Sequence, residues 1–328
     1  MKVLITGGTG FLGRMLAERL MERGKLTGPS GALEPIDELL LFDAAKPASP
    51  SPTIARPARV AIGDVADRRQ VDALVDRDDI SVFHLASIVS AGAEQDFDLA
   101  MRVNLDGVRH ILEACRRRRS RPRLVFASSV AVFGGPAMPS RCDDDTKQTP
   151  QTTYGMTKAI GELLVNDYTR KGFLDGRAAR LPTVIVRPGR PNRAASSFAS
   201  GVIREPHNRE PCLLPVGLET VMPVLGYRSV VEGLIRLHEA PSEAVGPDRA
   251  VNFPSLDVTV GEMIDALRRV ADGRELGPIE LKPDPEIQRI VAGWPTAIGS
   301  ARAAALGLPR DPDIDTIIRA YIDDFLAA

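Results

Sequence analysis

The fold is decided by the stretch Val3-Leu4-Ile5-Thr6-Gly7-Gly8-Thr9-Gly10-Phe11-Leu12-Gly13. Its apolar start is typical of a buried parallel strand, and leucines at positions 12, 16 and 20 give the next segment one apolar helical face. Glycines at such a junction permit a tight turn and let a pyrophosphate approach the free N–H groups of the helix N-terminus. The stretch therefore predicts a βα unit that binds a dinucleotide; the alternative is a plain βα turn.

Strand and helix patterns continue to alternate through the first part of the chain. Apolar runs predict further strands at 39–42, 59–62, 82–87, 124–127 and 182–188. Beyond residue 189 the alternation breaks, with helical patterns at 230–238, 260–270 and 314–325 and a strand at 250–253. We predict an α/β fold, a Rossmann-type doubly wound parallel sheet with a smaller mixed α/β C-terminal domain that binds the substrate. The expected domains are residues 1–188, which would bind the dinucleotide, and residues 189–328. Strand 250–253 is a candidate to return to the first domain.

Acidic residues follow two of these strands. Asp43 ends the second strand about 30 residues after Gly13, whereas the ribose-binding acid usually comes about 20 residues on. The polar segment 25–37 lies between Gly13 and Asp43 and accounts for the longer spacing. An acid here would accept from a ribose 2′-hydroxyl and repel a 2′-phosphate, which favours NAD over NADP. Asp64 follows the third strand and is placed to meet the adenine.

The chemistry is expected between Ser128 and Lys158. Tyr154 and Lys158 are four residues apart, so they share one face of a helix. A free phenol titrates near 10, and a nearby ammonium lowers the pKa toward the range where a phenolate can act as a base. A serine hydroxyl can hold a substrate oxygen in line for proton transfer. The alternative is a surface helix that carries an aromatic residue and a solvated lysine.

Composition narrows the function classes. A net charge of −1 gives no electrostatic reason to expect nucleic acid or an anionic membrane as a partner. The arginines at 116–119 are interpreted as a solvated helix C-terminus, and no apolar run reaches the ~20 residues of a membrane span. The acidic run 143–145 lacks a histidine partner, so no metal is predicted. Three scattered cysteines and no signal-peptide pattern predict a reduced, cytoplasmic protein.

Taken together, these motifs resemble the extended short-chain dehydrogenase/reductase family. The matching residues, in the family's order, are Thr6-Gly7-x-x-Gly10-x-x-Gly13, Asp43, Asp64, Leu85-Ala86-Ser87, Asn104, Ser128-Ser129-x-x-Val132-Phe133-Gly134, Tyr154-x-x-x-Lys158 and Arg187-Pro188-Gly189. The resemblance implies that Tyr154 is the acid/base and that Lys158 holds the nicotinamide ribose and lowers the phenol's pKa. It implies that Ser129 orients the reacting oxygen, with Ser128 as the alternate, and that Asn104 takes part in the proton relay.

The same resemblance implies NAD as the cofactor and a set of residues that contact it. That set is Gly7, Gly10, Phe11, Leu12, Gly13, Asp43, Asp64, Val65, Leu85, Ala86, Ser87, Tyr154, Lys158 and Pro188.

Within the family, the chain is similar to a branch that oxidises small sugar acids. Both nucleotide-binding signatures of the nucleotide-sugar branch are missing, at Arg187–Asn192 and at Leu225–Glu232. The implied reaction is oxidation of the C2 hydroxyl of D-erythronate to 2-keto-D-erythronate. Arg187 is interpreted as structural because it ends a strand. The expected substrate-binding residues are Ser87, Ser129, Tyr154, Arg190, Asn192, Ser196, Ser197 and Arg228.

Two other functions stay open. A nucleotide-sugar epimerase or dehydratase would keep its NAD tightly bound and show no net reduction. A non-catalytic dinucleotide-sensing module is disfavoured, because it has no need of a serine, a tyrosine and a lysine spaced for catalysis. The sequence leaves the oligomeric state open, with a homodimer among the alternatives.

Overall fold

The central feature of the computed structural model is a seven-stranded sheet with the strand order β13-β9-β7-β6-β1-β4-β5. The structure describes residues 1–46, 58–191 and 194–326. Every pairing within this sheet is parallel, which confirms the predicted Rossmann-type architecture. Its strands are β1 (Lys2–Thr6), β4 (Glu38–Asp43), β5 (Ala58–Ile62), β6 (Ile80–His84), β7 (Arg123–Ser129), β9 (Asp175–Leu181) and β13 (Ala250–Asn252).

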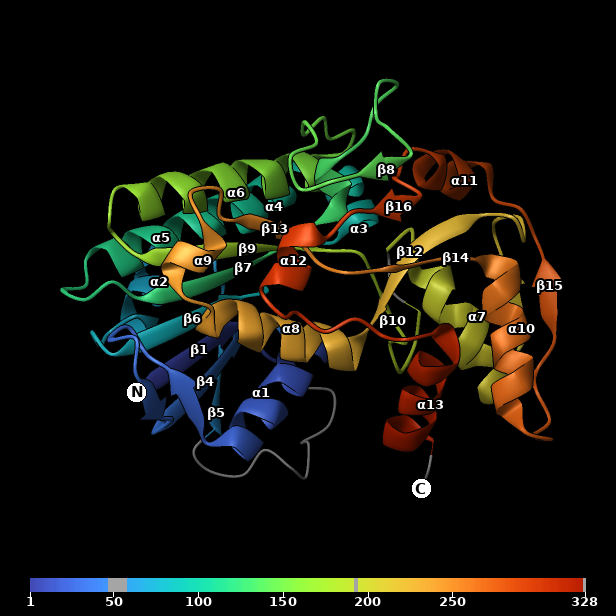
Figure 1. The fold of residues 1–328 in the computed structure, drawn as a ribbon, viewed down its shortest axis with the longest axis horizontal. Coiled ribbons are helices and arrows are strands. Elements are labelled where there is room, and N and C mark those ends of the chain that lie inside the picture. Colours follow the sequence, from blue (N-terminus) through green and yellow to red (C-terminus); the bar gives the residue numbers. More distant parts are fainter. Residues whose placement is uncertain (47–57, 192–193, 327–328) are drawn as a thin grey trace.

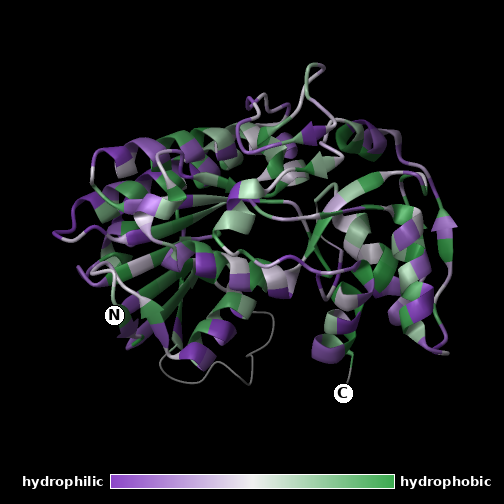
Figure 2. Cartoon of the chain, viewed as in Figure 1, coloured by the Kyte–Doolittle hydropathy of each residue, from purple (hydrophilic) through white to green (hydrophobic). Residues whose placement is uncertain are grey.

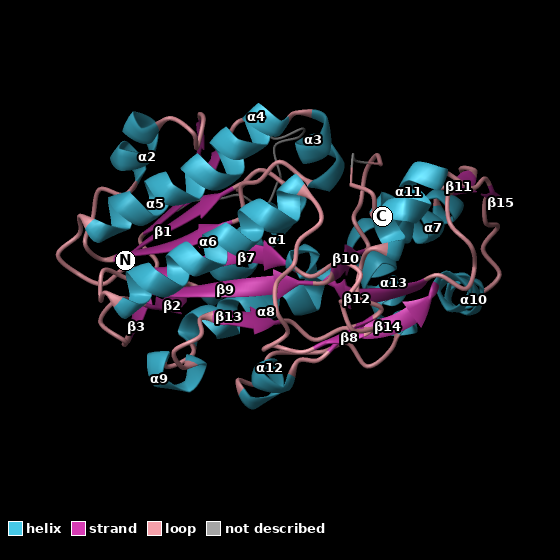
Figure 3. Cartoon of the chain, turned by 90° about the horizontal axis from the view of Figure 1, so that it is seen from above, coloured by secondary structure: helices cyan, strands magenta, loops and turns pink. Residues whose placement is uncertain are grey.

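Helices cover both faces of this sheet (Figure 1, Figure 3). Leu16 and Leu20 of one helix and Leu234 and Leu237 of another form one apolar layer with the strands. Val71, Ile111 and Val165 belong to the layer on the other face. Figure 2 shows apolar residues concentrated along the strands and hydrophilic residues on the outward helix faces. The helices are α1 (Phe11–Arg23) and α8 (Tyr227–Glu239) on the first face, and α2 (Arg68–Leu74), α5 (Gly107–Arg116) and α6 (Thr153–Arg170) on the second.

The sixth strand does not lie where the sequence predicts it. The main sheet uses β9 at 175–181, and the predicted segment 182–188 supplies only β10 (Thr183–Ile185), which joins a different sheet. The pattern misleads because β9 carries charged residues and is nevertheless buried along its whole length. Arg177 and Arg180 each reach a carboxylate, at 2.9 and 2.8 Å.

The helical segment between residues 97 and 116 forms in three parts. It consists of α4 (Phe97–Ala100), a π-helical turn η1 (Met101–Asp106) and α5. Asn104 lies in the π-helical turn and is buried. π-Helical turns occur frequently at functional sites.

The C-terminal part has its own apolar core beside the main sheet (Figure 1). Its three-stranded sheet has the order β10-β12-β14, in which β14 runs antiparallel to β12. The chain is not divided by a single boundary, because α8 and β13 return to the main sheet. The elements of this part are β11 (Cys212–Leu214), β12 (Val221–Gly226), β14 (Leu256–Thr259), β15 (Ile279–Leu281), α7 (Ser197–His207), α10 (Val260–Ala271), α11 (Pro285–Ala292) and α13 (Ile314–Phe325).

Short elements complete the structure. They are β2 (Lys25–Thr27), β3 (Leu33–Pro35), β8 (Arg141–Cys142), β16 (Ala297–Ile298), α3 (Ser90–Gln95), α9 (Ser242–Val245), α12 (Ala301–Ala305) and the 3₁₀ turn η2 (Val130–Val132). None of the helices in the described ranges is both long enough and apolar enough to cross a membrane.

Candidate active site

A cavity of about 910 Å³ opens at the carboxyl ends of the parallel strands. This is the edge at which doubly wound sheets bind their ligands. Residues from both parts of the chain line it. They are Gly7, Gly10, Phe11, Leu12, Gly13, Phe42, Asp43, Ala44, Gly63, Asp64, Val65, Leu85, Ala86, Ser87, Ile88, Val89, Ser90, Leu99, Val103, Ala127, Ser128, Ser129, Val130, Ala131, Tyr154, Lys158, Leu181, Pro182, Thr183, Val184, Arg187, Ala194, Ser196 and Trp294.

The glycine loop fits a pyrophosphate. Gly7 has a φ of +69°, and a Cβ there would lie 2.8 Å from the backbone nitrogen of Ala86. A Cβ on Gly13 would lie 2.3 Å from the Gly7 oxygen. Gly10 is the N-cap of α1 and supplies no side chain to its N–H groups. These glycines therefore let the loop close tightly and leave the helix N-terminus open to an anion.

Both predicted acids lie at the cavity wall. The Asp43 carboxylate accepts from the backbone nitrogen of Thr9 at 3.0 Å and from that of Ala45 at 3.3 Å. This contact ties the end of β4 to the glycine loop. Asp64 accepts from the backbone nitrogen of Ala66 at 2.9 Å, which shapes the turn after β5.

Ser129, Tyr154 and Lys158 line the same cavity. Tyr154 lies in the first turn of α6, which Thr152 caps by accepting from the Gly155 nitrogen at 3.0 Å. Lys158 Nζ donates to the Ala127 carbonyl oxygen at 2.6 Å and lies 5.4 Å from the centroid of the Tyr154 ring. The structure thus brings the tyrosine, the lysine and the serine to one cavity, and their catalytic roles stay predictions.

The pKa values of this pair differ from the expectation. Burial raises the pKa of the Tyr154 phenol above its usual range, and its interaction with Ser129 only partly opposes that effect. Burial also lowers the pKa of Lys158 to about 7, against the attraction of Glu162. Removal from water disfavours both charged forms, so the lowering of the phenol's pKa by the lysine stays a prediction.

The two serines have different partners. Ser128 is buried and donates to the Glu162 carboxylate, which also binds Arg180. Ser129 Oγ accepts from the backbone nitrogen of Ala131 at 3.1 Å and borders the cavity beside Tyr154. This arrangement favours Ser129 over Ser128 as the group that meets the reacting oxygen.

Asn104 lies behind the cavity wall. Its side chain accepts from Ser87 Oγ at 3.1 Å and from the Ile88 nitrogen at 2.7 Å, and it donates to Thr157 Oγ1 at 3.4 Å. It is not among the described residues that line the cavity. Asn104 thereby joins the loop after β6 to helix α6, and its part in a proton relay stays a prediction.

The predicted substrate residues separate into two groups. Ser87, Ser129, Tyr154 and Ser196 line the cavity. Ser197, at the start of α7, the exposed Arg190 and the predicted cofactor residue Pro188 fall outside the described lining, and Asn192 lies outside the described residues.

Arg228, which is expected to approach the substrate, falls outside the described lining of the cavity, and its part in substrate binding stays a prediction. Its guanidinium pairs with Asp324 on α13, with nitrogen–oxygen distances of 2.9 and 2.6 Å. This ion pair satisfies the charge of Arg228 away from the cavity.

Arg187, interpreted from the sequence as structural, lines the cavity. Its Nη1 is buried and has no hydrogen-bond partner within the described part of the chain. Burial, and then the charge of Arg204, lowers its pKa. The sequence offered one usable signal, because Arg187 follows a strand on the edge where the other site residues lie. Trp294 was also missed as a lining residue, since no pattern connects it to the strand ends.

Comparison with known proteins places this site in a family. A model of the NAD dependent epimerase/dehydratase family matches residues 3–252. The chain belongs to this family. D-erythronate dehydrogenase of Cupriavidus necator is 48% identical over 99% of this chain and 98% of its own length. The Haemophilus influenzae protein of the same name is 40% identical, over 98% of this chain and 99% of its own.

Solved structures of the same family agree with the fold. A structure described as a nucleoside-diphosphate-sugar epimerase from Agrobacterium tumefaciens has a TM-score of 0.90 and 39% identity, over 99% of this chain and 94% of that one. L-threonine 3-dehydrogenase from Trypanosoma brucei has a TM-score of 0.85 and 26% identity, over 98% of this chain and 95% of that one. Membership of the NAD dependent epimerase/dehydratase family confirms the prediction of NAD as the cofactor.

Proposed function

We propose that this protein oxidises the C2 hydroxyl of D-erythronate to 2-keto-D-erythronate with NAD as the oxidant. Two relatives named D-erythronate dehydrogenase, at 48% and 40% identity over nearly the full chain, support the proposal. The structural observation that carries it is the guanidinium of Arg187.

Arg187 brings a positive charge to the cavity that contains Tyr154, and no ion pair joins it to a carboxylate among the described residues. Its backbone is held on both sides, since its nitrogen donates to Ser200 Oγ at 3.0 Å and its oxygen accepts from Arg204 at 2.8 Å. Arg204 pairs with Glu205, whereas Nη1 of Arg187 has no partner among the described residues. A buried donor without a partner is costly, and a carboxylate would remove that cost. A sugar acid supplies such a carboxylate.

The chain's residues have the following roles in this proposal. Arg187 binds the carboxylate, Ser129 orients the C2 oxygen, and Tyr154 takes the hydroxyl proton. Lys158 lies beside the phenol and is placed to hold a ribose hydroxyl. Bound NAD would supply the acceptor for the hydride that leaves C2. The glycine loop, Asp43 and Asp64 would hold it at the strand ends.

The test is NADH formation, followed by absorbance, with D-erythronate and with erythritol, which has the same carbon count but no carboxylate. We expect D-erythronate to be oxidised and erythritol to give little signal. Losing a charge-assisted hydrogen bond costs about 1.5–3 kcal/mol, so Arg187→Gln should lower kcat/KM about 10- to 150-fold. Arg319→Gln, at an exposed arginine of α13 outside the described lining, is the matched control and should retain wild-type activity. Equal rates on erythronate and erythritol would refute the carboxylate site.

The main rival is a nucleotide-sugar epimerase, which the name of the Agrobacterium relative favours. Epimerisation of UDP-glucose without net NADH formation would establish that rival. Binding of NAD with no turnover of any hydroxy acid would support a dinucleotide-sensing module. Assembly as a homodimer, and the division of cofactor and substrate binding between 1–188 and 189–328, stay predictions.

A further inference from the structure

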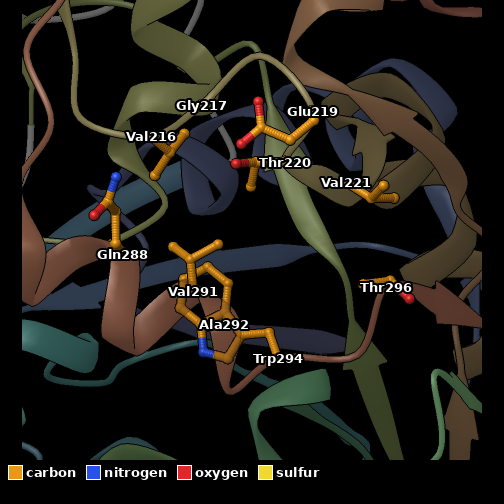
Figure 4. Close-up of a pocket in the computed structure, with 10 residues that line it drawn as sticks. All are labelled: Val216, Gly217, Glu219, Thr220, Val221, Gln288, Val291, Ala292, Trp294 and Thr296. Carbon is orange, nitrogen blue, oxygen red and sulfur yellow. The ribbon is translucent and has the colours of Figure 1, made fainter.

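A second cavity of about 340 Å³ adjoins the site, and Trp294 is the one described residue that lines both cavities. Strand β12 and its preceding loop form one side of this second cavity, and the end of α11 forms the other (Figure 4). Its lining residues are Val216, Gly217, Glu219, Thr220, Val221, Gln288, Val291, Ala292, Trp294 and Thr296.

We propose that the indole of Trp294 sets the chain length of the substrate by closing the sugar-acid site off from this second cavity. The inference rests on the proposed function and deepens it. In the large cavity, Trp294 lies with Arg187 and Ser196, which come from the part of the chain after the cofactor-binding strands. A carboxylate on Arg187 and a C2 oxygen at Tyr154 leave the remaining carbons to extend along this wall.

Contacts on both sides hold Trp294 in place. Asp284 caps α11 by accepting from the nitrogens of Glu286 and Ile287, and the Trp294 nitrogen donates to the Val291 oxygen at 3.0 Å. After Trp294, the nitrogens of Thr296 and Ala297 both donate to the Ser140 oxygen, at 3.1 and 3.0 Å. The indole also packs against the apolar core of the C-terminal part. The hydrogen bonds fix the backbone on both sides of Trp294, and packing against this core lets the planar indole act as a wall.

The space behind the wall suits a polyol. Glu219, Thr220, Gln288 and Thr296 bring hydrogen-bonding groups to the second cavity (Figure 4). These groups match the hydroxyls of a longer aldonic acid. Removal of the indole would join the two cavities and give a five- or six-carbon acid room to bind.

The experiment compares kcat/KM for four-, five- and six-carbon aldonic acids in the wild type and in Trp294→Ala. Pockets discriminate single extra carbons by about 10- to 200-fold, so we expect the six-to-four-carbon ratio to rise at least about tenfold in the variant. Trp294→Phe should keep the four-carbon preference, and Trp294→Leu should admit the five-carbon acid. Val291→Ala, which enlarges the second cavity without opening the wall, is the control and should leave the ratio unchanged. Unchanged ratios in both Trp294→Ala and Trp294→Leu would overturn the inference.

A binding measurement is independent of those variants. Trp294 is the only tryptophan in the sequence, so the protein's tryptophan emission reports on this wall. In the Tyr154→Phe variant saturated with NAD, a titration with D-erythronate should change the tryptophan emission until it reaches a plateau. No change in the emission would overturn the inference. If the wild type oxidises D-erythronate but the tests at Trp294 fail, only the inference falls. If the wild type oxidises no sugar acid, the proposed function falls and the inference falls with it.

Discussion

In the proposed reaction Tyr154 acts as the base, although burial raises its pKa and Lys158 donates to the Ala127 carbonyl oxygen. We expect Tyr154→Phe to lower kcat by about 10²–10⁴, the usual share of general acid–base catalysis. NAD affinity, measured by calorimetry, should barely change, since the phenyl ring still fills the same space. A Phe variant with near-normal turnover would remove Tyr154 from the mechanism.

The Asp43 carboxylate ties the end of β4 to the glycine loop by accepting a hydrogen bond from the Thr9 nitrogen. Because its charge would repel a 2′-phosphate, kcat/KM with NAD should exceed that with NADP by at least about tenfold, or 1.4 kcal/mol. Asp43→Asn removes the charge but keeps an acceptor oxygen for Thr9, so it should narrow that gap. The exposed Asp98 offers a control. Asp98→Asn should leave the ratio of kcat/KM with NAD to that with NADP unchanged. Equal efficiency of the wild type with both cofactors would contradict the assignment.

At the level of residues, the sequence predicted what depends on short spacing. Tyr154 and Lys158 lie one turn apart on one helix, and Gly7, Gly10 and Gly13 lie at the junction of β1 and α1, so local geometry brings each set together. Arg187 and Arg228 depend instead on distant partners. The Arg228 side chain binds Asp324, 96 residues further along the chain, while Nη1 of Arg187 has no hydrogen-bond partner in the described chain. A single sequence does not show which arginine forms an ion pair with an acid that is distant along the chain.

At the level of elements, β9 shows why a strand can be missed. Its arginines pair with buried acids. Arg177 pairs with Asp175 of the same strand, which also binds Arg249, and Arg180 pairs with Glu162 of α6. Apolar runs identify strands whose two faces are covered by apolar side chains, which holds for β1, β4 and β7. A strand whose charges are neutralised only after folding has no such run.

The Arg180–Glu162 pair gives a test of that account. Removing one member of a buried ion pair leaves an unpaired charge and costs about 3–5 kcal/mol. Arg180→Leu should therefore lower the free energy of unfolding by about that amount in urea. The double variant Arg180→Leu with Glu162→Leu should be less destabilised than the single one. Arg268→Leu breaks an exposed ion pair with Asp265 at 3.4 Å and should change the free energy of unfolding by under about 1 kcal/mol. Additive effects of the two buried substitutions would show that the ions do not stabilise each other.

On the scale of the whole molecule, buried histidines make stability depend on pH. Burial, and then the charge of Lys158, lowers the pKa of His84 from 6.5 to about 3. Between those two values the unfolded chain holds more protons than the folded one, so stability falls as pH drops from about 6.5 towards 3. We expect the urea midpoint to decrease over this range, and less steeply in His84→Gln. An identical slope in the variant would exclude His84 as a source of the loss.

The path of the chain also limits how this protein can be recombined with its relatives. Residues after 189 leave the main sheet and then come back twice, as helix α8 and as strand β13 beside β9. A chimera joined at position 189 would thus import α8 and β13 from the donor and place them against a sheet that evolved with other neighbours. Exchange of substrate preference between family members would need a graft of several separate segments that leaves 227–239 and 250–252 with the host.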